Sequence, residues 1–411
     1  MSRRRHHDDG DGMEGEEFLS ITGKPLPRLA HANDILGKCR SIDDYEKLNR
    51  LGEGTYGVVH RSRDLETSGI VALKQIRILD HDRGNGIPIT ALREISILKS
   101  LRHPNIISVL DVAVADLDDI YMVMEYAEQD LANLLDYARV KFSESEVKCL
   151  MKQLLEGLEY LHRKDIIHRD IKMSNLLLTR HGILKLADFG LAREYTPRPL
   201  TPGVVTVWYR SPELLLSTSR YTTAVDIWSS GCIMGELILC APLLPGDTEL
   251  DQWRLISSLL GAPSERIWPR MRNLPGLPTP SDGDPHRVRL RPPPPPPPGP
   301  MQRNKLEQKL GGQKKECINL VNELLTYDPE RRPSAGRALR HPYFTKESPS
   351  ACRPEMIQTF PEIRNDVKEV EAGGGRVRGG GGMEAGSGYV FDFGEVGGGE
   401  GEARRKRRKQ A

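Results

Sequence analysis

This sequence has few cysteines, no long apolar runs and little excess of either charge. Its six cysteines among 411 residues show no C-x-x-C spacing, which argues against a zinc site or a disulfide framework and fits thiols in a reducing compartment. No apolar run approaches the roughly 18 residues that a membrane span needs. Met1 to Arg5 are followed by His and Asp rather than by the apolar segment of a secretory signal. We therefore expect a soluble, intracellular protein with no membrane partner.

The net charge gives no indication of a partner. Lysine plus arginine total 59 and aspartate plus glutamate total 57, which gives a net charge of +2. A balance this close to zero predicts no strongly charged partner for the chain as a whole. Hydrophobic residues make up 38% and charged residues 28%, which is the composition of a globular protein with a sizeable core.

The most informative stretch is 167–175, with the sequence Ile-His-Arg-Asp-Ile-Lys-Met-Ser-Asn. Two short strands are predicted after it, around an Arg-His-Gly turn at 180–182. Such a hairpin brings Asn175 next to Asp188, and amide and carboxylate oxygens are ligands that Mg²⁺ accepts. Asp170 can accept the proton of a substrate hydroxyl, and Lys172 can face a phosphoryl group during its transfer.

These residues match the protein-kinase catalytic loop, H-R-D-L-x-x-x-N followed by D-F-G at 188–190, with Ile171 in place of the leucine. A charged surface loop is the competing interpretation of either motif alone. Both motifs in this order, with strands between them, favour kinase chemistry. The residues assigned to catalysis are Asp170, Lys172 and Asn175, and those assigned to a metal are Asn175 and Asp188.

A glycine-rich segment at 51–59, Leu-Gly-Glu-Gly-Thr-Tyr-Gly-Val-Val, has the pattern G-x-G-x-x-G-x-V. Glycines let backbone N–H groups approach phosphates closely, although a plain hairpin turn can have the same pattern. Strand residues follow where a dinucleotide-binding motif requires a helix. The strand Val-Ala-Leu-Lys then ends in Lys74, which we expect to contact nucleotide phosphates rather than only to protect a sheet edge.

An apolar stripe at helical spacing predicts a helix over residues 87–101. We expect its Glu94 to pair with Lys74 and to orient that lysine. The segment Pro-Ile-Thr-Ala-Leu-Arg-Glu at 88–94 resembles the helix by which cyclin-dependent kinases recognise their cyclin. An ordinary amphipathic helix explains the packing of the stripe but not the apolar residues at 87–89.

The strand at 120–125 and the turn at 126–130 resemble the hinge between the two lobes of a kinase, whose backbone pairs with adenine. In that interpretation Met124 closes the back of the pocket and Asp130 contacts the ribose. The residues assigned to ATP are Leu51, Gly52, Glu53, Gly54, Thr55, Tyr56, Gly57, Val59, Ala72, Lys74, Glu94, Met124, Glu125, Ala127, Asp130 and Leu177.

Residues from about 38 to 366 resemble the cyclin-dependent Ser/Thr protein kinases. The resemblance implies an α+β, bilobal protein-kinase fold with a small β-rich N-lobe and a larger α-helical C-lobe. It implies ATP and Mg²⁺ as cofactors, a cyclin partner and protein substrates, with Val204 and Val205 favouring a proline after the target Ser or Thr. The heptad at 88–94 has the form typical of kinases of transcription elongation. A different subgroup agrees with the stretches 38–41, 126–131, 142–149, 200–206 and 352–356.

The segment after residue 190 contains the expected regulatory site. Thr201 resembles the activating phosphosite of the family, and a phosphate there adds about −1.5 to −2 charges. The arginines expected to converge on that phosphate are Arg93, Arg169 and Arg193. Thr55 and Tyr56 are candidate inhibitory phosphosites. Glu213 and Arg332 are expected to form a structural ion pair.

The predicted organisation has a disordered tail at 1–40, a kinase domain at 45–344, an extension at 345–370 and a Gly-rich disordered tail with a basic end at 371–411. Within the kinase domain we expect the N-lobe at 45–125, the hinge at 126–130, the C-lobe at 131–344 and a Pro/Gly-rich insert at 270–308.

Two low-complexity runs lie outside the expected core. The prolines from Pro292 to Pro298 predict a polyproline helix, which is either a solvated spacer or a docking site for a proline-recognising domain. The basic run from Arg404 to Lys409 is a candidate nuclear-import signal. We expect a protein of the nucleus, and also of the cytoplasm, with no direct nucleic-acid contact. A solvated tail or a phosphate-binding patch has the same composition.

Two alternatives to an active kinase are a nucleic-acid-associated regulator acting through its tails and a kinase-fold scaffold without catalysis. The scaffold predicts the loss of at least one key residue of the site. All five of these residues are present, namely Lys74, Glu94, Asp170, Asn175 and Asp188.

Overall fold

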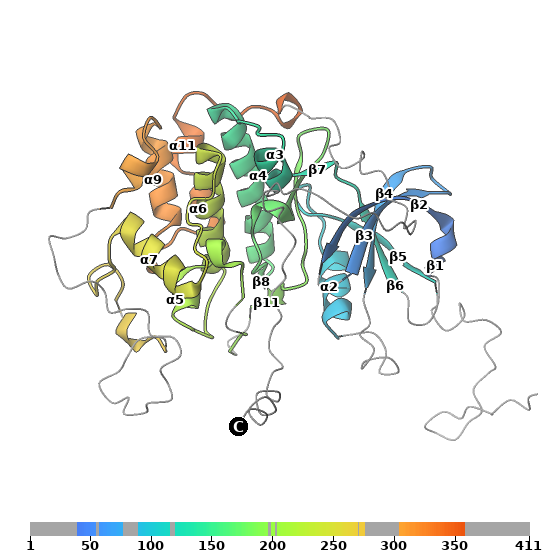
Figure 1. Ribbon diagram of the computed structural model, residues 1–411, viewed down its shortest axis with the longest axis horizontal. Coiled ribbons are helices and arrows are strands. Elements are labelled where there is room, and N and C mark those ends of the chain that lie inside the picture. The colour runs from blue at the N-terminus through green and yellow to red at the C-terminus, as the bar shows by residue number, and fades with distance from the viewer. Residues whose placement is uncertain are drawn as a thin grey trace, which may run out of the picture.

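The computed structural model describes residues 39–54, 57–76, 89–115, 120–195, 199–201, 204–269, 271–275 and 304–357. Two parts lie side by side, one built on a β-sheet and the other mainly on helices (Figure 1). This is the α+β, two-lobed arrangement that the sequence predicts. Among the described residues, no helix is both long enough and apolar enough to span a membrane.

The N-lobe is built on a six-stranded sheet with the order β1-β5-β6-β4-β3-β2. β1 runs parallel to β5, and the other neighbouring pairs are antiparallel. The strands are β1 (Arg40–Ser41), β2 (Tyr45–Gly54), β3 (Gly57–Asp64), β4 (Ile70–Ile76), β5 (Val109–Val114) and β6 (Ile120–Glu125).

The alternation of side chains along β4 decides which residues face the helices. Val71 and Leu73 pack with residues of β6 on one face of the sheet. Since successive side chains point to opposite faces, Ala72 and Lys74 lie on the other face. Ala72 belongs to the main hydrophobic core there, together with Met124 of β6. Lys74 is thereby directed towards the junction of the two lobes.

The helix α2 (Ile89–Ser100) packs against β5. Its Ala91 and Leu98 are buried, as is Leu101 just beyond its end, and Ile95 is partly buried. The helix predicted over 87–101 is therefore confirmed from Ile89 onward. Residues 87 and 88, the start of the predicted cyclin-recognition helix, lie outside the described part of the chain.

The C-lobe is organised around α4 (Glu144–His162). Its start is determined by a capping box, in which the Ser143 side chain accepts from the Glu146 backbone and the Glu146 side chain accepts from the Ser143 backbone. Its predicted apolar face is fully buried at Leu150, Leu154 and Leu158, against neighbouring helices. The other α-helices among the described residues are α3 (Leu131–Asp136), α5 (Pro212–Leu215), α6 (Ala224–Leu239), α7 (Glu249–Leu260), α8 (Leu306–Lys309), α9 (Lys315–Leu324), α10 (Ala335–Leu339) and α11 (Pro342–Thr345). The 3₁₀ turns are η1 (Ile42–Asp44), η3 (Met173–Asn175), η4 (Val207–Tyr209), η5 (Met271–Asn273) and η7 (Pro354–Met356).

Short strands hold the loops at the junction of the lobes. β7 (Gln129–Asp130), β9 (Leu176–Leu178) and β10 (Leu184–Leu186) form a sheet in the order β10-β9-β7. The predicted hairpin is confirmed, because β9 and β10 pair antiparallel. β8 (Ile166–Ile167) pairs with β11 (Arg193–Glu194) and so ties the catalytic loop to the segment after Asp-Phe-Gly.

The predicted ion pair between Glu213 and Arg332 is also confirmed. The two guanidinium nitrogens of Arg332 donate to the two carboxylate oxygens of Glu213 at 2.9 and 3.0 Å. Both side chains are almost completely buried. A bidentate pair in this setting depends on both partners, since removing one leaves a buried charge uncompensated.

The boundaries of the predicted tails need one correction. Arg40, which was placed in the disordered N-terminal tail, belongs to β1, because its backbone pairs with Ala113 of β5. The predicted extension at 345–370 is described as far as Ile357. The proline run, the basic end of the chain, Thr55 and Tyr56 lie outside the described residues, and the insert at 270–308 is described only at 271–275 and 304–308.

Candidate active site

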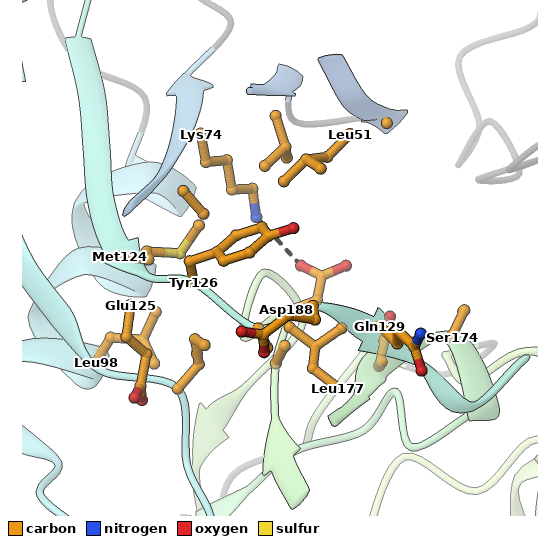
Figure 2. Close-up of a pocket in the computed structure, with 18 of the residues that line it drawn as sticks. Leu51, Lys74, Leu98, Met124, Glu125, Tyr126, Gln129, Ser174, Leu177 and Asp188 are labelled. Carbon is orange, nitrogen blue, oxygen red and sulfur yellow. Dashed lines mark hydrogen bonds and ion pairs between the residues drawn. The ribbon is translucent and has the colours of Figure 1, made fainter. Parts of the chain in front are cut away.

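A pocket lies between the lobes, beside the turn that joins β6 to β7 (Figure 2). Leu51 and Val59 line it from the N-lobe, and Leu177 lines it from the C-lobe. Most of the residues assigned to ATP contribute to the lining. These are Leu51, Gly52, Gly57, Val59, Ala72, Lys74, Glu94, Met124, Glu125, Ala127 and Leu177, and the metal candidates Asn175 and Asp188 join them.

The pocket combines apolar walls with a charged end. Leu51, Met124 and Leu177 belong to the core or pack against it, so a flat apolar ring can be held between them. Lys74 and Asp188 point towards each other inside the pocket (Figure 2). The arrangement suits a ligand with an aromatic base at one end and phosphates at the other.

Lys74 is held between two carboxylates. Its Nζ lies 2.8 Å from Glu94 Oε1 and 3.3 Å from Asp188 Oδ1. Burial would lower the pKa of Lys74, but the negative charges of Asp188 and Glu94 outweigh that effect and raise it. Burial would likewise raise the pKa of Asp188, whereas the charges of Lys74 and Lys172 hold it below its ordinary value. The lysine is therefore positive and the aspartate negative at neutral pH, and the predicted pair between Lys74 and Glu94 is confirmed.

The carboxylate of Asp170 is surrounded by donors. Lys172 Nζ lies 2.9 Å from its Oδ2, and the Asn175 amide donates to the same oxygen at 2.9 Å. Thr206 Oγ1 donates to Oδ1 at 3.3 Å. Because the Asn175 NH₂ group also donates to the Asp170 backbone carbonyl, its amide oxygen is the atom that can ligate a cation.

Asp226 is a residue of this site that the sequence analysis missed. It is buried at the start of α6 and accepts hydrogen bonds from the backbone N–H groups of His168 and Arg169 at 3.0 and 2.9 Å. His162 Nε2 lies 2.9 Å from the same carboxylate. Burial would raise the pKa of Asp226, but hydrogen bonding from His162 and the other donors lowers it. An acidic residue inside the apolar run at 224–228 is the signal that could have identified it.

These bonds hold the catalytic loop in an unusual backbone conformation. Arg169 has a φ of 67° and Asp188 a φ of 62°, values that cost energy for residues other than glycine. His168 joins the two positions, since its Nε2 pairs with the Ala187 carbonyl at 3.1 Å and its ring packs edge-on against Phe189. Burial lowers the pKa of His168, so its ring is neutral at pH 7 and the contact does not add a charge.

The structure connects one of the three predicted arginines, Arg169, to the backbone of Thr201. Arg169 Nη1 donates to the Tyr221 hydroxyl at 2.7 Å, and that hydroxyl donates to the Thr201 backbone carbonyl at 2.9 Å. Burial raises the pKa of Tyr221, and the charges of Arg169 and Arg193 oppose the rise. Among the described contacts none joins Arg93 to Thr201. Tyr221 carries no motif that would have identified it in the sequence.

The backbone around the predicted proline pocket has a specific geometry. Val205 has a φ of 73°. Its carbonyl accepts two hydrogen bonds from the Arg210 guanidinium, from Nε at 3.0 Å and from Nη2 at 2.7 Å. The same guanidinium pairs with Glu249 at the start of α7. The carbonyl of Val205 is therefore already occupied within the chain.

Five residues assigned to ATP are not among those that line the pocket, namely Glu53, Gly54, Thr55, Tyr56 and Asp130. Both carboxylate oxygens of Asp130 accept from Asn133, at 2.9 Å from its backbone N–H and at 2.7 Å from its amide. Asp130 thus caps α3, and its contact with a ribose stays a prediction. Thr55 and Tyr56 lie outside the described residues, so their assignments stay predictions.

A two-lobed fold, a pocket with apolar walls and charged groups at the junction, and a Lys–Glu–Asp cluster beside a loop aspartate together define the class of protein kinases. Comparison with known proteins agrees, since the protein kinase domain family matches residues 45–344. Cyclin-dependent kinase 10 of Rattus norvegicus is 49% identical over 343 residues, which cover 83% of this chain and 90% of the rat protein. Cyclin-dependent kinase 10 of Homo sapiens is 50% identical over 333 residues, which cover 80% of this chain and 87% of the human protein. Cyclin-dependent kinase G-2 of Oryza sativa subsp. japonica is 45% identical over 369 residues, which cover 87% of this chain and 49% of the rice protein.

The chain therefore belongs to the protein kinase family and, within it, to the cyclin-dependent kinases, which are Ser/Thr protein kinases. The subgroup indicated by the local stretches 38–41, 126–131, 142–149, 200–206 and 352–356 is cyclin-dependent kinase 10, and the comparisons confirm that similarity. The heptad at 88–94, which has the form typical of a different subgroup, does not change this result.

Proposed function

We propose that this protein transfers the γ-phosphoryl group of ATP to Ser or Thr residues of proteins once a cyclin has bound. The observation that carries the proposal is the joint geometry of Lys74, Glu94 and Asp188 with the Asp170–Asn175 loop. Phosphoryl transfer depends mainly on positioning and charge stabilisation. The described side chains supply both, so the geometry favours an active enzyme over a scaffold.

The residues present fit ATP with Mg²⁺, a pairing typical of the family. Asp188 is held ionised. The Ala187 backbone N–H donates to the backbone carbonyl of Asn175 at 3.0 Å, so the chain next to Asp188 is bonded to Asn175, whose side chain has an amide oxygen. A hard cation prefers such oxygen donors, and when bound it would neutralise charge on the phosphates. Lys74 would hold those phosphates from the other side. Asp170 would accept the proton of the attacking hydroxyl, with Lys172 beside it.

The Val205 backbone supports a preference for proline directly after the target residue. A substrate residue with a backbone N–H would need an acceptor when it is buried at that position. The Val205 carbonyl is occupied by Arg210, whereas proline has no N–H to satisfy. The unsatisfied backbone N–H would therefore disfavour other residues at this position, and proline would be favoured.

A cyclin and a phosphate are proposed as the two activators. The relatives named as cyclin-dependent kinases support the first. The second rests on the position of Thr201, which is exposed and connected through Tyr221 to Arg169. A phosphate there could form charge-assisted hydrogen bonds with this basic neighbourhood.

Two further proposals rest on the sequence alone. The basic run from Arg404 to Lys409 supports import into the nucleus. The run from Pro292 to Pro298 supports either a spacer or the docking of a proline-recognising domain, and the spacer is the simpler role.

The substitution Asp170→Asn tests the catalytic assignment. It keeps the size of the side chain and removes the proton acceptor, so phosphotransfer should fall by about 10² to 10⁴. ATP affinity should stay within about twofold, because the nucleotide contacts come from other residues. The test compares turnover and nucleotide binding of the purified mutant and wild type, each with its cyclin. Wild-type turnover of the mutant would contradict the proposed role.

A further inference from the structure

A segment beyond the matched kinase domain packs closely against the catalytic lobe. The family match ends at residue 344, whereas the described chain continues through η7 to Ile357. Residues 346–357, here called the C-terminal strap, run from the end of α11 past the start of α4 to the turn between β9 and β10 (Figure 1). Its contacts with these two elements are described in turn.

The first anchor is Lys148, in the second turn of α4. Its side chain is 0% exposed. Its Nζ donates to the backbone carbonyls of Glu347 and Pro349, each at 2.8 Å, and lies 3.3 Å from the Glu144 carboxylate. A buried ammonium group is tolerated only when its donors are satisfied. The strap therefore supplies partners that Lys148 requires.

A second set of bonds fastens the middle of the strap. Ser145 Oγ donates to the Ser350 carbonyl at 2.6 Å, and the Cys352 backbone N–H donates to the Ser145 carbonyl at 3.2 Å. The strap is thus bonded along the first two turns of α4.

The end of the strap lies directly against Gly182, in the turn between β9 and β10. Gly182 has a φ of 72°, and a Cβ on it would lie 1.8 Å from the Pro354 carbonyl oxygen. Ile357, which is only 2% exposed, lies next to the same glycine. On the inner side of the turn, Gln153 Nε2 of α4 donates to the Gly182 carbonyl at 3.1 Å. The turn is therefore held between α4 and the strap.

This turn belongs to the hairpin that separates the two metal candidates. β9 begins directly after Asn175, and β10 ends two residues before Asp188. Gln153 Oε1 also accepts from the Leu184 backbone N–H at 3.0 Å, so the return strand of the hairpin is bonded to the same helix. A shift of the turn would be passed along two short strands to both metal candidates.

We propose that the C-terminal strap is a positioning segment of the active site, which holds the β9–β10 turn and thereby the spacing of Asn175 and Asp188. The inference rests on the proposed function, in which these two residues face the metal. Groups that orient metal ligands without touching the metal typically change affinity or activity by about 10- to 100-fold when removed. Loss of the strap should have an effect at the lower end of that range.

Two C-terminal truncations give a direct test. One chain stops after Thr345 and lacks the strap, and the other stops after Ile357 and keeps it. With cyclin bound, the shorter chain should need about tenfold more Mg²⁺ for half-maximal turnover. The longer chain should match the full-length protein. Equal Mg²⁺ dependence of two folded truncations would overturn the proposal.

A full-length variant tests the same contact without shortening the chain. Gly182→Ala places a Cβ against the Pro354 carbonyl. Gly312→Ala is its matched control, because Gly312 also has a positive φ, 88°, but no atom within 4 Å of the added Cβ. Backbone amide hydrogen exchange at 176–186 is measured without metal or nucleotide, together with the Mg²⁺ dependence of turnover. The exchange rates and the Mg²⁺ dependence should both change in Gly182→Ala, and neither should change in Gly312→Ala. Equal exchange rates at 176–186 in the two variants would overturn the inference.

Asp188→Asn separates this inference from the proposed function. Wild-type turnover of that variant would contradict the assignment of the metal, whatever the strap does. Asp188→Asn could lose turnover while hydrogen exchange in the β9–β10 hairpin stays unaltered in Gly182→Ala. That result would support the proposed function and contradict the positioning role of the strap.

Discussion

At the residue scale, the site depends on charges that buried partners hold in position. Lys74 stays positive because two carboxylates approach it. Asp226 holds two backbone N–H groups of the catalytic loop and so stabilises the positive φ of Arg169. Each of these groups would be costly to bury without its partner. Single substitutions in this network should therefore change function more than exposed substitutions do.

Arg210 provides a test of substrate preference at this scale. Arg210→Met removes the two hydrogen bonds to the Val205 carbonyl and leaves that carbonyl able to accept from a substrate. The ratio of kcat/KM for a Ser-Pro peptide to that for a matched Ser-Ala peptide should fall about tenfold, since one unmet buried donor costs about 1–3 kcal/mol. Arg220→Met, at an exposed arginine, is the control. An unchanged ratio in Arg210→Met would remove the carbonyl from the explanation.

Glu236 provides a test of pH dependence. Burial raises its pKa to about 7 from an ordinary value of 4.5, although the Tyr209 hydroxyl donates to it at 2.8 Å. Between these pH values the folded state holds a proton that the unfolded state has lost, so this group makes the protein less stable as pH rises from about 4.5 to 7. Glu236→Gln lacks this effect.

The free energy of unfolding of Glu236→Gln should therefore increase relative to that of wild type as pH rises, and the difference should level off above pH 7. Chemical unfolding of both proteins at pH 5, 6 and 7.5 measures this difference. If the difference in free energy of unfolding is the same at all three pH values, the Glu236 carboxyl is ionised in the folded protein at each of them.

At the scale of elements, the main regulatory parts are α2 and the segment from β11 to α5. A cyclin bound against α2 would hold Glu94 in the inward position that its pairing with Lys74 requires. In the structure Glu94 already pairs with Lys74 at 2.8 Å within the chain itself. The packing of the chain alone is therefore compatible with this position of α2. We expect activation to depend more on the segment that carries Thr201.

Thr201→Ala tests that segment. Without the phosphate, the charge-assisted contacts with Arg169 and its neighbours are lost, each worth about 1.5–3 kcal/mol. Turnover with cyclin bound should fall about tenfold or more. Ser219→Ala is a control in the neighbouring segment, where the backbone carbonyl rather than the side chain contacts Leu200. Full turnover of Thr201→Ala would remove this threonine from the switch, and full turnover of the lone unphosphorylated chain would remove the switch itself.

At the scale of the whole molecule, the kinase fold accounts for the chemistry, and we propose that the segments around it serve location and support. A fluorescent fusion that ends at Glu402 lacks the basic run from Arg404 to Lys409. It should spread into the cytoplasm, whereas the full-length fusion should accumulate in the nucleus. Replacing Arg3, Arg4 and Arg5 with alanine in the full-length chain is the control. Unchanged nuclear signal after the truncation would indicate import through the cyclin or through those three arginines.

The sequence by itself determined the class of fold, the hairpin between the two motifs and the ion pair of Glu213 with Arg332. These features follow from local patterns, because side-chain alternation, turn residues and motif spacing act over short stretches of chain. The same patterns identified most of the residues that line the pocket. They did so because the chemistry of phosphoryl transfer restricts the residue types that can serve there.

Only the tertiary structure decided how distant segments meet. Asp226 lies 57 residues from the Arg169 backbone N–H that it accepts from, and Tyr221 lies 20 residues from the Thr201 carbonyl. Nothing in a local pattern records such contacts, because they arise when helices and loops pack together around a shared core. The same reason explains the C-terminal strap, whose contact with Gly182 exists only because the fold brings residues 182 and 354 together.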